Sequence, residues 1–293
     1  MHTIAKIEKT VMYKYHSIWE KLYNDIKGGI WPIEVPLEAD FYYLPKYMQE
    51  RFLEVVYNPN WSGIQRWHTP GPNKYSVFYS EECNGGGTVY SEDYVENIQK
   101  RYPGRKFDRC YEWCSGPGFI GFTLLDYNIC SSLCLTDIYN PALEWAEETK
   151  NYPKNNLKDK VDIYLLKDLK LLPVEEKFDL VVSNPPHSNN LCANDLSHNL
   201  NRIVTDFGWD SHYNFYKNIK NYLTPDGVII MLENHGGSTV EDFRPMIEES
   251  GLTITDSWNS KNIYSDTNKE WDQDNPDKNE HINKIYYIEI THN

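Results

Sequence analysis

The stretch that decides the fold is Tyr111-Glu112-Trp113-Cys114-Ser115-Gly116-Pro117-Gly118-Phe119-Ile120-Gly121-Phe122. An apolar-leaning run over 107–113 leads into Gly116, Pro117 and Gly118, and a second apolar run with helical spacing follows over 120–125. This order predicts a strand, a tight glycine turn and a helix. Because Gly116 and Gly118 have no Cβ and can take backbone angles forbidden to other residues, a ligand can lie directly against the main chain. The stretch therefore predicts a site for a small molecule.

Strand and helix patterns alternate from this stretch to the end of the chain. The strand candidates span 109–113, 132–137, 162–166, 178–183, 227–233, 252–258 and 284–291, and the helix candidates span 119–127, 141–151, 209–223 and 240–250. Such alternation predicts an α/β fold with a doubly wound sheet. A polar loop rather than a helix joins the last two strand candidates, so we expect them to form an antiparallel pair at one edge. Ligands of these sheets bind at the carboxyl ends of the strands, where Gly116 would lie.

The composition is acidic and unusually aromatic. The chain has 293 residues with 29 Lys and Arg against 43 Asp and Glu, a formal net charge of −14. Binding of a polyanion normally needs a basic face, so a nucleic-acid partner is not expected. The one dense basic cluster is expected to be a solvated helix end or loop: Lys100, Arg101, Arg105, Lys106 and Arg109. Aromatic residues make up 14% of the chain, and aromatic side chains commonly line ligand pockets.

The sequence shows neither a membrane span nor a signal peptide. No apolar run is long enough to cross a bilayer, and residues 1–17 lack a signal-peptide core. We therefore expect a soluble, cytoplasmic protein, and nothing in the pattern indicates an oligomeric state. The six cysteines have no Cys-x-x-Cys spacing and are expected to be reduced thiols in the core. The nine histidines show no ligand spacing, so no metal site is expected.

Residues 1–87 are expected to form a region of their own, followed by a ligand-binding domain over 88–293. Segments 4–25 and 45–56 have helical patterns, and 58–73 is rich in Pro, Gly and Trp and is expected to be an ordered loop. The region is too aromatic for a linker. We expect an aromatic-rich helical cap over the site, although a structural appendage would fit the pattern nearly as well.

A glycine-rich turn over 84–87 leads into a helix expected over 93–100. Ser91 has the residue type of a helix N-cap. The glycines can serve as a hinge. Alternatively, the turn places Thr88 and Tyr90 beside the ligand held by the turn at 116–118.

Two carboxylates stand at the expected ends of neighbouring strands. Asp137 ends the second strand candidate, where a carboxylate can accept hydrogen bonds from two ribose hydroxyls. Asp168 follows the third, where it could accept from an adenine amino group. Each is a weak signal alone, because strands and loops often carry Asp.

The fourth strand candidate carries the most specific signal. The apolar run over 178–183 continues directly into Asn184-Pro185-Pro186-His187. Two consecutive prolines fix an extended backbone and remove two N–H donors, so the carbonyls nearby can accept hydrogen bonds from a ligand. With the side-chain oxygen of Asn184 they predict acceptors for the two hydrogens of an –NH₂ group.

These motifs together resemble the class I S-adenosylmethionine-dependent methyltransferases, in the branch that methylates amide or exocyclic amino nitrogens. The stretch 112–118 is similar to the family's glycine motif, Asp137 to its ribose carboxylate, and 184–187 to its Asn-Pro-Pro-aromatic motif. The resemblance covers about 84–291 and implies a seven-stranded Rossmann-like sheet. His187 stands where the family usually has Tyr or Phe, and the N-terminal region does not match the helical domain of the release-factor methyltransferases.

The resemblance also implies the cofactor and a set of site residues. S-adenosylmethionine would be bound by Glu112, Cys114, Ser115, Gly116, Gly118, Phe119, Asp137, Ile138, Asp168, Leu169 and Asn184. Asn184 and the carbonyl of Pro185 would orient the acceptor nitrogen, and Tyr90 would face the sulfonium as a cation–π partner. His187 would stack on the acceptor plane or receive a proton after transfer, and stacking is the preferred interpretation.

Methyl transfer to a nitrogen of a small molecule or a protein amide is the leading hypothesis. A second hypothesis keeps S-adenosylmethionine but breaks another sulfonium bond by cyclisation, elimination or aminocarboxypropyl transfer, with release of methylthioadenosine. A third is methylation of adenine N6 in RNA, which the acidic composition disfavours. A non-catalytic binding module is a further alternative, and the intact Asn184-Pro185-Pro186 argues against it.

Overall fold

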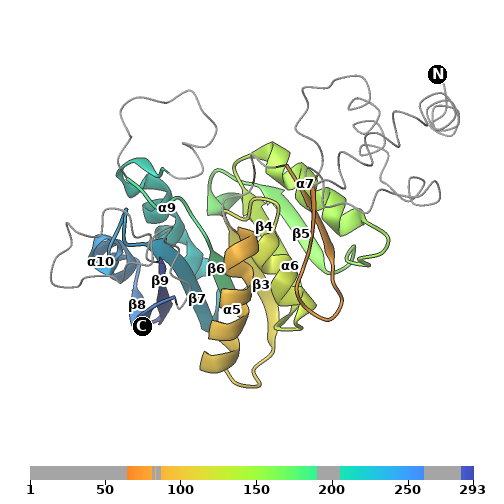
Figure 1. Ribbon diagram of the computed structural model, residues 1–293. Coiled ribbons are helices and arrows are strands. Elements are labelled where there is room, and N and C mark those ends of the chain that lie inside the picture. The colour runs from red at the N-terminus through yellow and green to blue at the C-terminus, as the bar shows by residue number, and fades with distance from the viewer. Residues whose placement is uncertain (1–64, 81–82, 84–86, 190–204, 261–284) are drawn as a thin grey trace, which may run out of the picture.

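The computed structural model describes residues 65–80, 83, 87–189, 205–260 and 285–293 (Figure 1). Its centre is a seven-stranded sheet in the order β5-β4-β3-β6-β7-β9-β8. The strands are β3 (Phe107–Trp113), β4 (Cys130–Asp137), β5 (Val161–Leu165), β6 (Phe178–Ser183), β7 (Leu223–Asn234), β8 (Leu252–Asn259) and β9 (Ile285–His292). Strands β3 to β7 pair in parallel, and β9 is antiparallel to both β7 and β8. The expected doubly wound α/β sheet and its antiparallel edge pair are confirmed.

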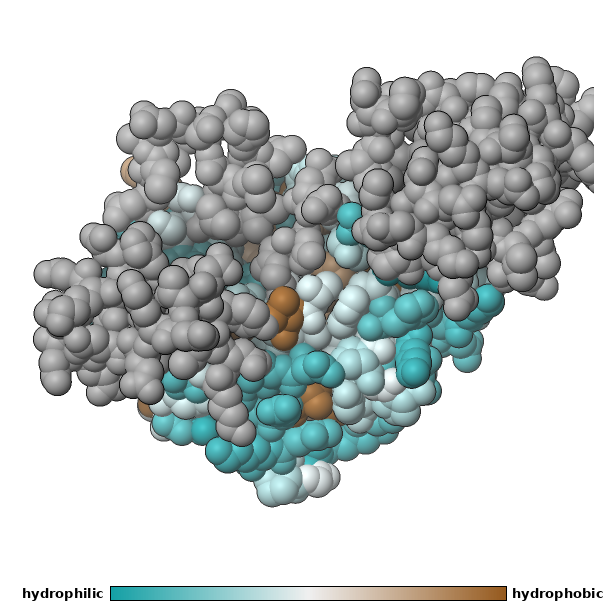
Figure 2. Space-filling model, viewed as in Figure 1, coloured by the Kyte–Doolittle hydropathy of each residue, from teal (hydrophilic) through white to brown (hydrophobic). Residues whose placement is uncertain are grey.

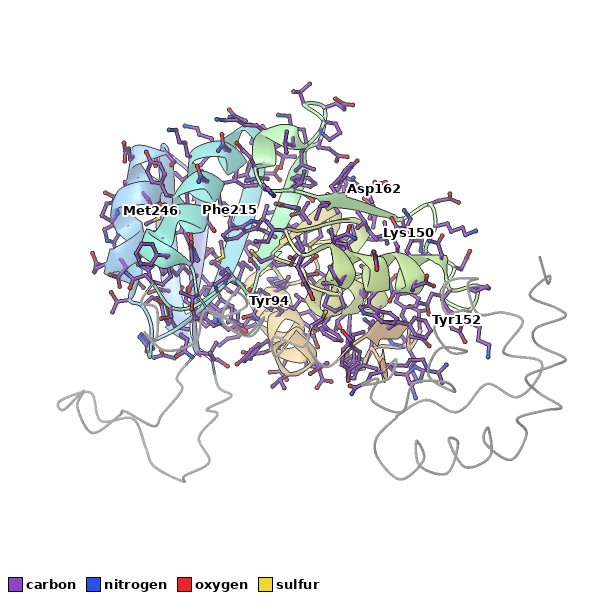
Figure 3. The ribbon with its side chains drawn as sticks, turned by 90° about the horizontal axis from the view of Figure 1, so that it is seen from above. Tyr94, Lys150, Tyr152, Asp162, Phe215 and Met246 are labelled. Atoms are coloured by element: carbon purple, nitrogen blue, oxygen red, sulfur yellow. The ribbon has the colours of Figure 1, made fainter. Side chains whose placement is uncertain are left out.

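Helices cover both faces of the sheet. They are α5 (Gly87–Arg101), α6 (Phe119–Asp126), α7 (Asn140–Asn151), α9 (Asp210–Ile219) and α10 (Val240–Glu249). Short 3₁₀ turns lie at η3 (Leu169–Leu171), η4 (Phe207–Trp209) and η5 (Lys220–Tyr222). Figure 3 shows Tyr94 of α5 on the opposite side of the sheet from Phe215 of α9 and Met246 of α10. The sheet is therefore the middle layer of three.

Alternation along the strands builds two separate cores. On β7, Val228, Ile230 and Leu232 belong to the core under α5 and α6, whereas Ile229 and Met231 belong to the core under α9 and α10. Successive side chains of a strand point to opposite faces, and a parallel strand covered on both sides is apolar at nearly every position. This burial explains the apolar run over 178–183 in the fourth strand candidate.

A β-hairpin precedes the sheet and was not predicted. Strands β1 (Gln65–His68) and β2 (Ser76–Tyr79) pair antiparallel, within and beyond a segment expected to be a loop. The N–H of Phe78 donates to Thr149 Oγ1 of α7 at 2.9 Å, and Tyr75, Val77 and Tyr79 belong to the core under α5 and α6. Residues 65–80 thus pack with the main domain. The expected helices over 4–25 and 45–56, and with them most of the cap, lie outside the described residues.

The start of α5 corrects one local expectation. The helix begins at Gly87, so Ser91 lies within it and is not its N-cap. The hydroxyl of Ser91 donates to the Thr88 carbonyl at 3.2 Å, the back-bond that Ser commonly makes inside a helix. The expected helix is present, but it starts earlier than predicted. A glycine can lie in a helix when the residues after it pack into the core, as Tyr94, Val95 and Ile98 do.

The described cysteines are mostly buried, and the described surface is mostly hydrophilic. Cys83, Cys110, Cys130 and Cys134 are buried free thiols and Cys114 is half-buried, while Cys192 lies outside the described residues. Figure 2 shows a mostly hydrophilic face over the described part of the chain, with small hydrophobic spots. None of the described helices combines the length and apolar character that a bilayer span requires.

The two turn glycines allow a matched test of the fold. Gly118 has φ +87°, and a Cβ there would lie 2.7 Å from Leu135 and 2.8 Å from Phe122, whereas Gly116 has φ +53° and its nearest contact would be 3.6 Å away. Gly118→Ala combines backbone strain with overpacking and should lower the free energy of unfolding by about 3 kcal/mol. Gly116→Ala carries the strain alone and should cost about 1 kcal/mol. Urea denaturation of both variants measures the difference, and equal losses would contradict this packing.

Candidate active site

A cavity of about 300 Å³ opens at the carboxyl ends of the central parallel strands. Its lining includes Cys114 and Gly116 after β3, Asp137 at the end of β4 with Ile138 after it, and Asn184 after β6. Neighbouring strands lie about 4.8 Å apart, so the ends of β4 and β6 are separated by about 10 Å, with β3 between them. The structure therefore brings the glycine turn, the expected ribose carboxylate and the Asn-Pro-Pro motif to one cavity.

The glycine turn is fixed by the neighbouring strand. The N–H of Ser115 donates to the Thr136 carbonyl at 3.0 Å, and the N–H of Gly116 donates to Asp137 Oδ2 at 2.8 Å. Gly116 lines the cavity, as expected for a place where a ligand lies on the main chain. Gly118 does not line the cavity, and its missing Cβ instead makes room for Leu135 and Phe122. The two glycines therefore serve the ligand surface and the helix–strand packing, respectively.

Glu112 lies beneath the turn, almost fully buried. Its Oε2 accepts from the N–H of Gly121 at 2.8 Å, which ties the end of β3 to the first turn of α6. Burial raises the pKa of Glu112 to about 8, against the lowering effect of hydrogen bonds from the N–H groups of Gly121 and Ile120. Glu112 also borders the cavity, so it supports the turn in addition to facing the ligand space.

Asp137 is held at the end of β4 by backbone donors. Its Oδ2 accepts from Gly116 and its Oδ1 from the N–H of Tyr139, each at 2.8 Å. Burial raises the pKa of this carboxyl, and these N–H groups oppose the rise. Each carboxylate oxygen can accept a second hydrogen bond, so the two ribose hydroxyls of a nucleoside can still be bound. The acceptor positions that Asp137 still has therefore fit the ribose-binding role expected for it.

Both apolar and polar side chains line the cavity near Asp137. Ile138 is 64% exposed and lines it together with Leu169, Phe119 and Ser115. Asp168 also lines the cavity, and its Oδ1 accepts from the N–H of Lys170 at 3.0 Å, which caps η3. All the residues expected to bind the cofactor line this cavity except Gly118.

The Asn-Pro-Pro motif is anchored where β6 ends. The Ser183 carbonyl accepts from the Tyr94 hydroxyl at 2.5 Å, and the Ser183 hydroxyl donates to the Trp113 carbonyl at 2.6 Å. These bonds hold the strand end beside the glycine turn. Asn184 and Pro186 line the cavity, whereas Pro185 and His187 do not.

His187 contacts polar groups rather than the cavity. Its Nε2 lies 2.9 Å from Asn184 Oδ1, and its Nδ1 lies 3.4 Å from Glu233 Oε2 at the end of β7. Stacking of His187 on an acceptor stays a prediction. Tyr90 is half-buried against the core and does not line the cavity, so its role at the sulfonium also stays a prediction.

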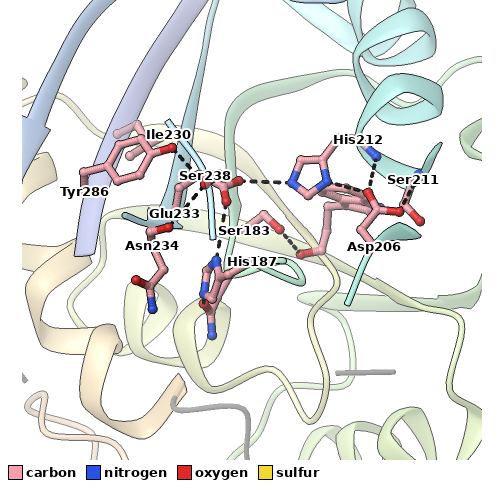
Figure 4. Close-up of polar contacts among 12 residues, drawn as sticks. Ser183, His187, Asp206, Ser211, His212, Ile230, Glu233, Asn234, Ser238 and Tyr286 are labelled. Carbon is pink, nitrogen blue, oxygen red and sulfur yellow. Dashed lines mark hydrogen bonds and ion pairs between the residues drawn. The ribbon is translucent and has the colours of Figure 1, made fainter. Parts of the chain in front are cut away.

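A buried cluster of one histidine and two carboxylates adjoins His187 (Figure 4). It was not predicted from the sequence. His212 of α9 is fully buried, with Nδ1 2.6 Å from Asp206 Oδ2 and Nε2 3.0 Å from Glu233 Oε1. Burial opposes protonation of His212, but the two carboxylates outweigh it and raise its pKa to about 9. Burial acts against the ionised forms of Glu233 and Asp206, but His212 lowers the pKa of both. At neutral pH the group is an imidazolium between two carboxylates.

The part of the cavity beyond the expected cofactor residues was only partly predicted from the sequence. Its further lining residues are Trp113, Thr205, Asp210, Ser211, Asn214 and Phe215. Trp113 stacks on Phe215 with ring centroids 4.3 Å apart, giving this end a flat aromatic wall. Trp113 belongs to the stretch that decides the fold, and its aromatic type was the available signal. The others come from α9 and the segment before it, which carry no local motif.

Part of this chain is similar to known proteins. Residues 78–207 match the family model described as "Methyltransferase small domain". The ribosomal RNA small subunit methyltransferase C of Buchnera aphidicola subsp. Cinara cedri is 29% identical over 151 residues, which are 50% of this chain and 37% of that protein. The tRNA1(Val) (adenine(37)-N6)-methyltransferase of Glaesserella parasuis serovar 5 is 30% identical over 117 residues, 39% of this chain and 46% of that protein. The chain thus spans less than half the length of these relatives.

Solved structures with a similar fold include an S-adenosylmethionine-dependent methyltransferase from Clostridium acetobutylicum. It has a TM-score of 0.46 and 15% identity, and the match covers 70% of this chain and 91% of that one. The segment matched by the family model holds both the glycine turn and the Asn-Pro-Pro motif. The segment that carries the resemblance seen in the sequence is thus similar to a methyltransferase small domain. The expectation against a nucleic-acid partner conflicts with the relatives, which are named as RNA methyltransferases.

The role of Asp137 can be tested by binding alone. Asp137→Ala should weaken the affinity for S-adenosylhomocysteine at least tenfold, because hydrogen bonds to a charged group contribute about 1.5–3 kcal/mol each. Isothermal titration calorimetry measures the change, and Asp159→Ala, which alters a carboxylate outside the cavity lining, serves as the matched control. Unchanged affinity of Asp137→Ala would remove this residue from the cofactor site.

Proposed function

We propose that this protein transfers the methyl group of S-adenosylmethionine to a planar amino nitrogen, that of an amide or of an exocyclic amino group. The single observation that carries the proposal is that Asn184, at the end of β6, shares a cavity with Gly116 and Asp137. A nucleoside half and an amine-accepting half are thus joined in one space. The finer assignment of the acceptor rests on the chemistry of these two halves.

The amine-accepting half offers acceptors in a fixed direction. Asn184 Oδ1 contacts His187 Nε2, and a carbonyl oxygen can accept two hydrogen bonds, so it can also accept from a substrate N–H. Pro185 and Pro186 donate no N–H, so the backbone there presents carbonyls without competing donors. A planar –NH₂ group needs two acceptors. Asn184 lines the cavity and supplies one, whereas Pro185, whose carbonyl was expected to supply the other, does not line it. The flat wall of Trp113 and Phe215 suits the planar group that carries the amine.

The residues that would hold S-adenosylmethionine are Gly116, Asp137, Ile138, Asp168 and Leu169. When bound there, the sulfonium supplies a methyl group that is already activated toward a nucleophile. The protein's contribution is to hold the lone pair of the acceptor nitrogen toward the nucleoside half and to exclude water. Trp113 and Phe215 exclude water at the acceptor end, and Asn184 orients the nitrogen. The nitrogen gains the methyl group and loses a proton to solvent.

The electrostatics of the cavity favour a neutral or cationic acceptor. Among the described residues that line it, Asp137, Asp168 and Asp210 are acidic and Lys167 is basic, while Glu112, whose pKa burial raises to about 8, is mostly uncharged at neutral pH. A phosphate would be repelled by this balance. A small molecule with an amino or amide group, or a protein amide side chain, therefore remains the first candidate.

The arginines of the basic cluster are paired with acidic side chains. Arg101 pairs with Asp256 and Glu289, and Arg109 pairs with Asp162 and Glu176. These arginines lie at the amino-terminal side of β3, whereas the cavity opens at its carboxyl end. Their charges are therefore matched locally and far from the acceptor.

A second candidate acceptor is the amino group of a purine base in RNA. Both curated relatives are named as RNA methyltransferases, and one name specifies adenine N6. An adenine amino group is planar and has two hydrogens, so Asn184 and the adjoining carbonyls can accept it as they would an amide. RNA would then have to be bound by residues other than the described arginine cluster.

The role of Asn184 gives a direct test of the proposal. Wild-type protein is incubated with methyl-labelled S-adenosylmethionine and with small-molecule, protein and RNA fractions of a cell extract, and the labelled fraction identifies the acceptor class. Asn184→Ala should then lower kcat/KM for that acceptor by about 10²-fold or more, the usual effect of removing one well-placed polar group from an active site. The affinity for S-adenosylhomocysteine should fall far less than kcat/KM does, because the other residues expected to bind the cofactor are unchanged.

The matched control is Asn151→Ala, at the solvent-exposed end of α7. It should keep the wild-type rate. Label transferred at an undiminished rate by Asn184→Ala would contradict the proposed amine-accepting role.

A further inference from the structure

A continuous row of polar contacts runs from the cavity into the protein interior. It begins at Asn184 Oδ1, 2.9 Å from His187 Nε2, and continues from His187 Nδ1 to Glu233 Oε2 at 3.4 Å. From Glu233 Oε1 it passes to His212 Nε2 at 3.0 Å, and from His212 Nδ1 to Asp206 Oδ2 at 2.6 Å. Figure 4 shows the contacts of Glu233 with His187 and His212 and that of His212 with Asp206. We call these residues, Asn184, His187, Glu233, His212 and Asp206, the buried polar row.

Burial increases along the row. The side chain of His187 is 21% exposed, whereas those of Glu233 and His212 are 0% exposed. A buried charge without a partner costs several kcal/mol, so each member requires its neighbour. Both oxygens of Glu233 have a histidine partner, which leaves this carboxylate little freedom to rotate. The rigid, buried end of the row can therefore fix the position of its more exposed end.

The far end is anchored to the backbone. Asp206 accepts from the N–H groups of Ser211 and His212, each at 3.0 Å, at the start of α9. The N–H of Asp206 donates to the Ser188 carbonyl at 2.8 Å, and Ser188 directly follows His187. The row thus closes on itself through the main chain and ties together β6, β7 and α9.

Aromatic side chains enclose His212. Trp113 and Trp209 meet its ring edge-on, with centroids 5.3 Å and 5.1 Å away, and Phe243 stacks on it at 4.9 Å. Trp113 also lines the cavity, so the same packing borders the acceptor end. This packing limits movement of His212 and, through Glu233, of His187.

We propose that His187 and Glu233 are positioning residues, which hold the Asn184 amide in the one orientation that accepts the substrate amino group. The inference rests on the proposed function. His187 acts through its ring nitrogens, which bridge Asn184 and Glu233, rather than by stacking on the substrate. Glu233 fixes the histidine, and His212 with Asp206 fixes Glu233.

His187→Phe separates these two roles. Phe keeps a flat ring but has no nitrogen, so it preserves stacking and removes the bridge. The expected result is a fall in kcat of at least tenfold with less than a threefold change in affinity for S-adenosylhomocysteine. His187→Gln, whose amide can contact both Asn184 and Glu233, should recover part of the loss. A His187→Phe variant with wild-type kcat would overturn the proposal and favour stacking.

His235→Phe is the matched control. His235 Nε2 lies 3.0 Å from Asn259 Oδ1, the same atom pair as in the buried polar row, and His235 does not line the cavity. This variant should retain the wild-type kcat. An equal loss of kcat in the His235 and His187 variants would overturn the assignment. It would show that a histidine–asparagine contact of this kind affects only the stability of the protein.

Nuclear magnetic resonance tests the positioning without reference to turnover. In ¹⁵N-labelled wild-type protein the side-chain amide of Asn184 should give one sharp pair of proton signals. In His187→Phe and in Glu233→Gln these signals should shift or broaden, while the signals of Asn259 stay unchanged. Unaltered Asn184 signals in both variants would overturn the positioning role, whatever the activity. If the wild type methylates no acceptor but the Asn184 signals do respond, the proposed function fails and the positioning role stands.

Discussion

The site depends on the level at which three parallel strands end. Strand β3 lies between β4 and β6, and Trp113 is in register with both Thr136 and Ser183. The residues that follow, Cys114, Asp137 and Asn184, therefore leave the sheet at the same height. Parallel strands share one carboxyl edge, so their next residues converge above it. A slip of one residue in either pairing would turn side chains to the wrong face and separate the two halves of the cavity.

Polar contacts at the strand ends reinforce this register. The Ser115 N–H bonds to the Thr136 carbonyl, and the Ser183 hydroxyl bonds to the Trp113 carbonyl at 2.6 Å. Glu112 and Asp137 then connect the turn to α6 and to β4 through backbone N–H groups. Hydrogen bonds from backbone N–H groups, rather than counter-charges, oppose the burial of these carboxylates, and burial still raises the pKa of both. An acidic cavity results, and it suits a cationic sulfonium and a neutral amine better than it suits a phosphate.

The sequence predicted the parts of the site that are local in the chain. The glycine turn, the tip of β4 and the Asn-Pro-Pro segment are each a few adjacent residues with special backbone chemistry, and the structure brings them to one cavity. Glu233, His212 and Asp206 could not be predicted in this way, because they come from separate elements and meet only after β7 and α9 pack. Ser91 and the β1–β2 hairpin were misread because packing against α7 and the core outweighed local propensity. The different roles of Gly116 and Gly118 could not be predicted either, because they depend on which residues pack against each glycine.

The central claim is that the methyl carbon–sulfur bond is the one that breaks. Its most direct test is mass spectrometry of the nucleoside products after purified protein is incubated with S-adenosylmethionine and the acceptor-containing extract fraction. We expect S-adenosylhomocysteine in equal amount to the methylated acceptor. Accumulation of methylthioadenosine, with or without extract, would contradict it and show that another substituent of the sulfonium reacts.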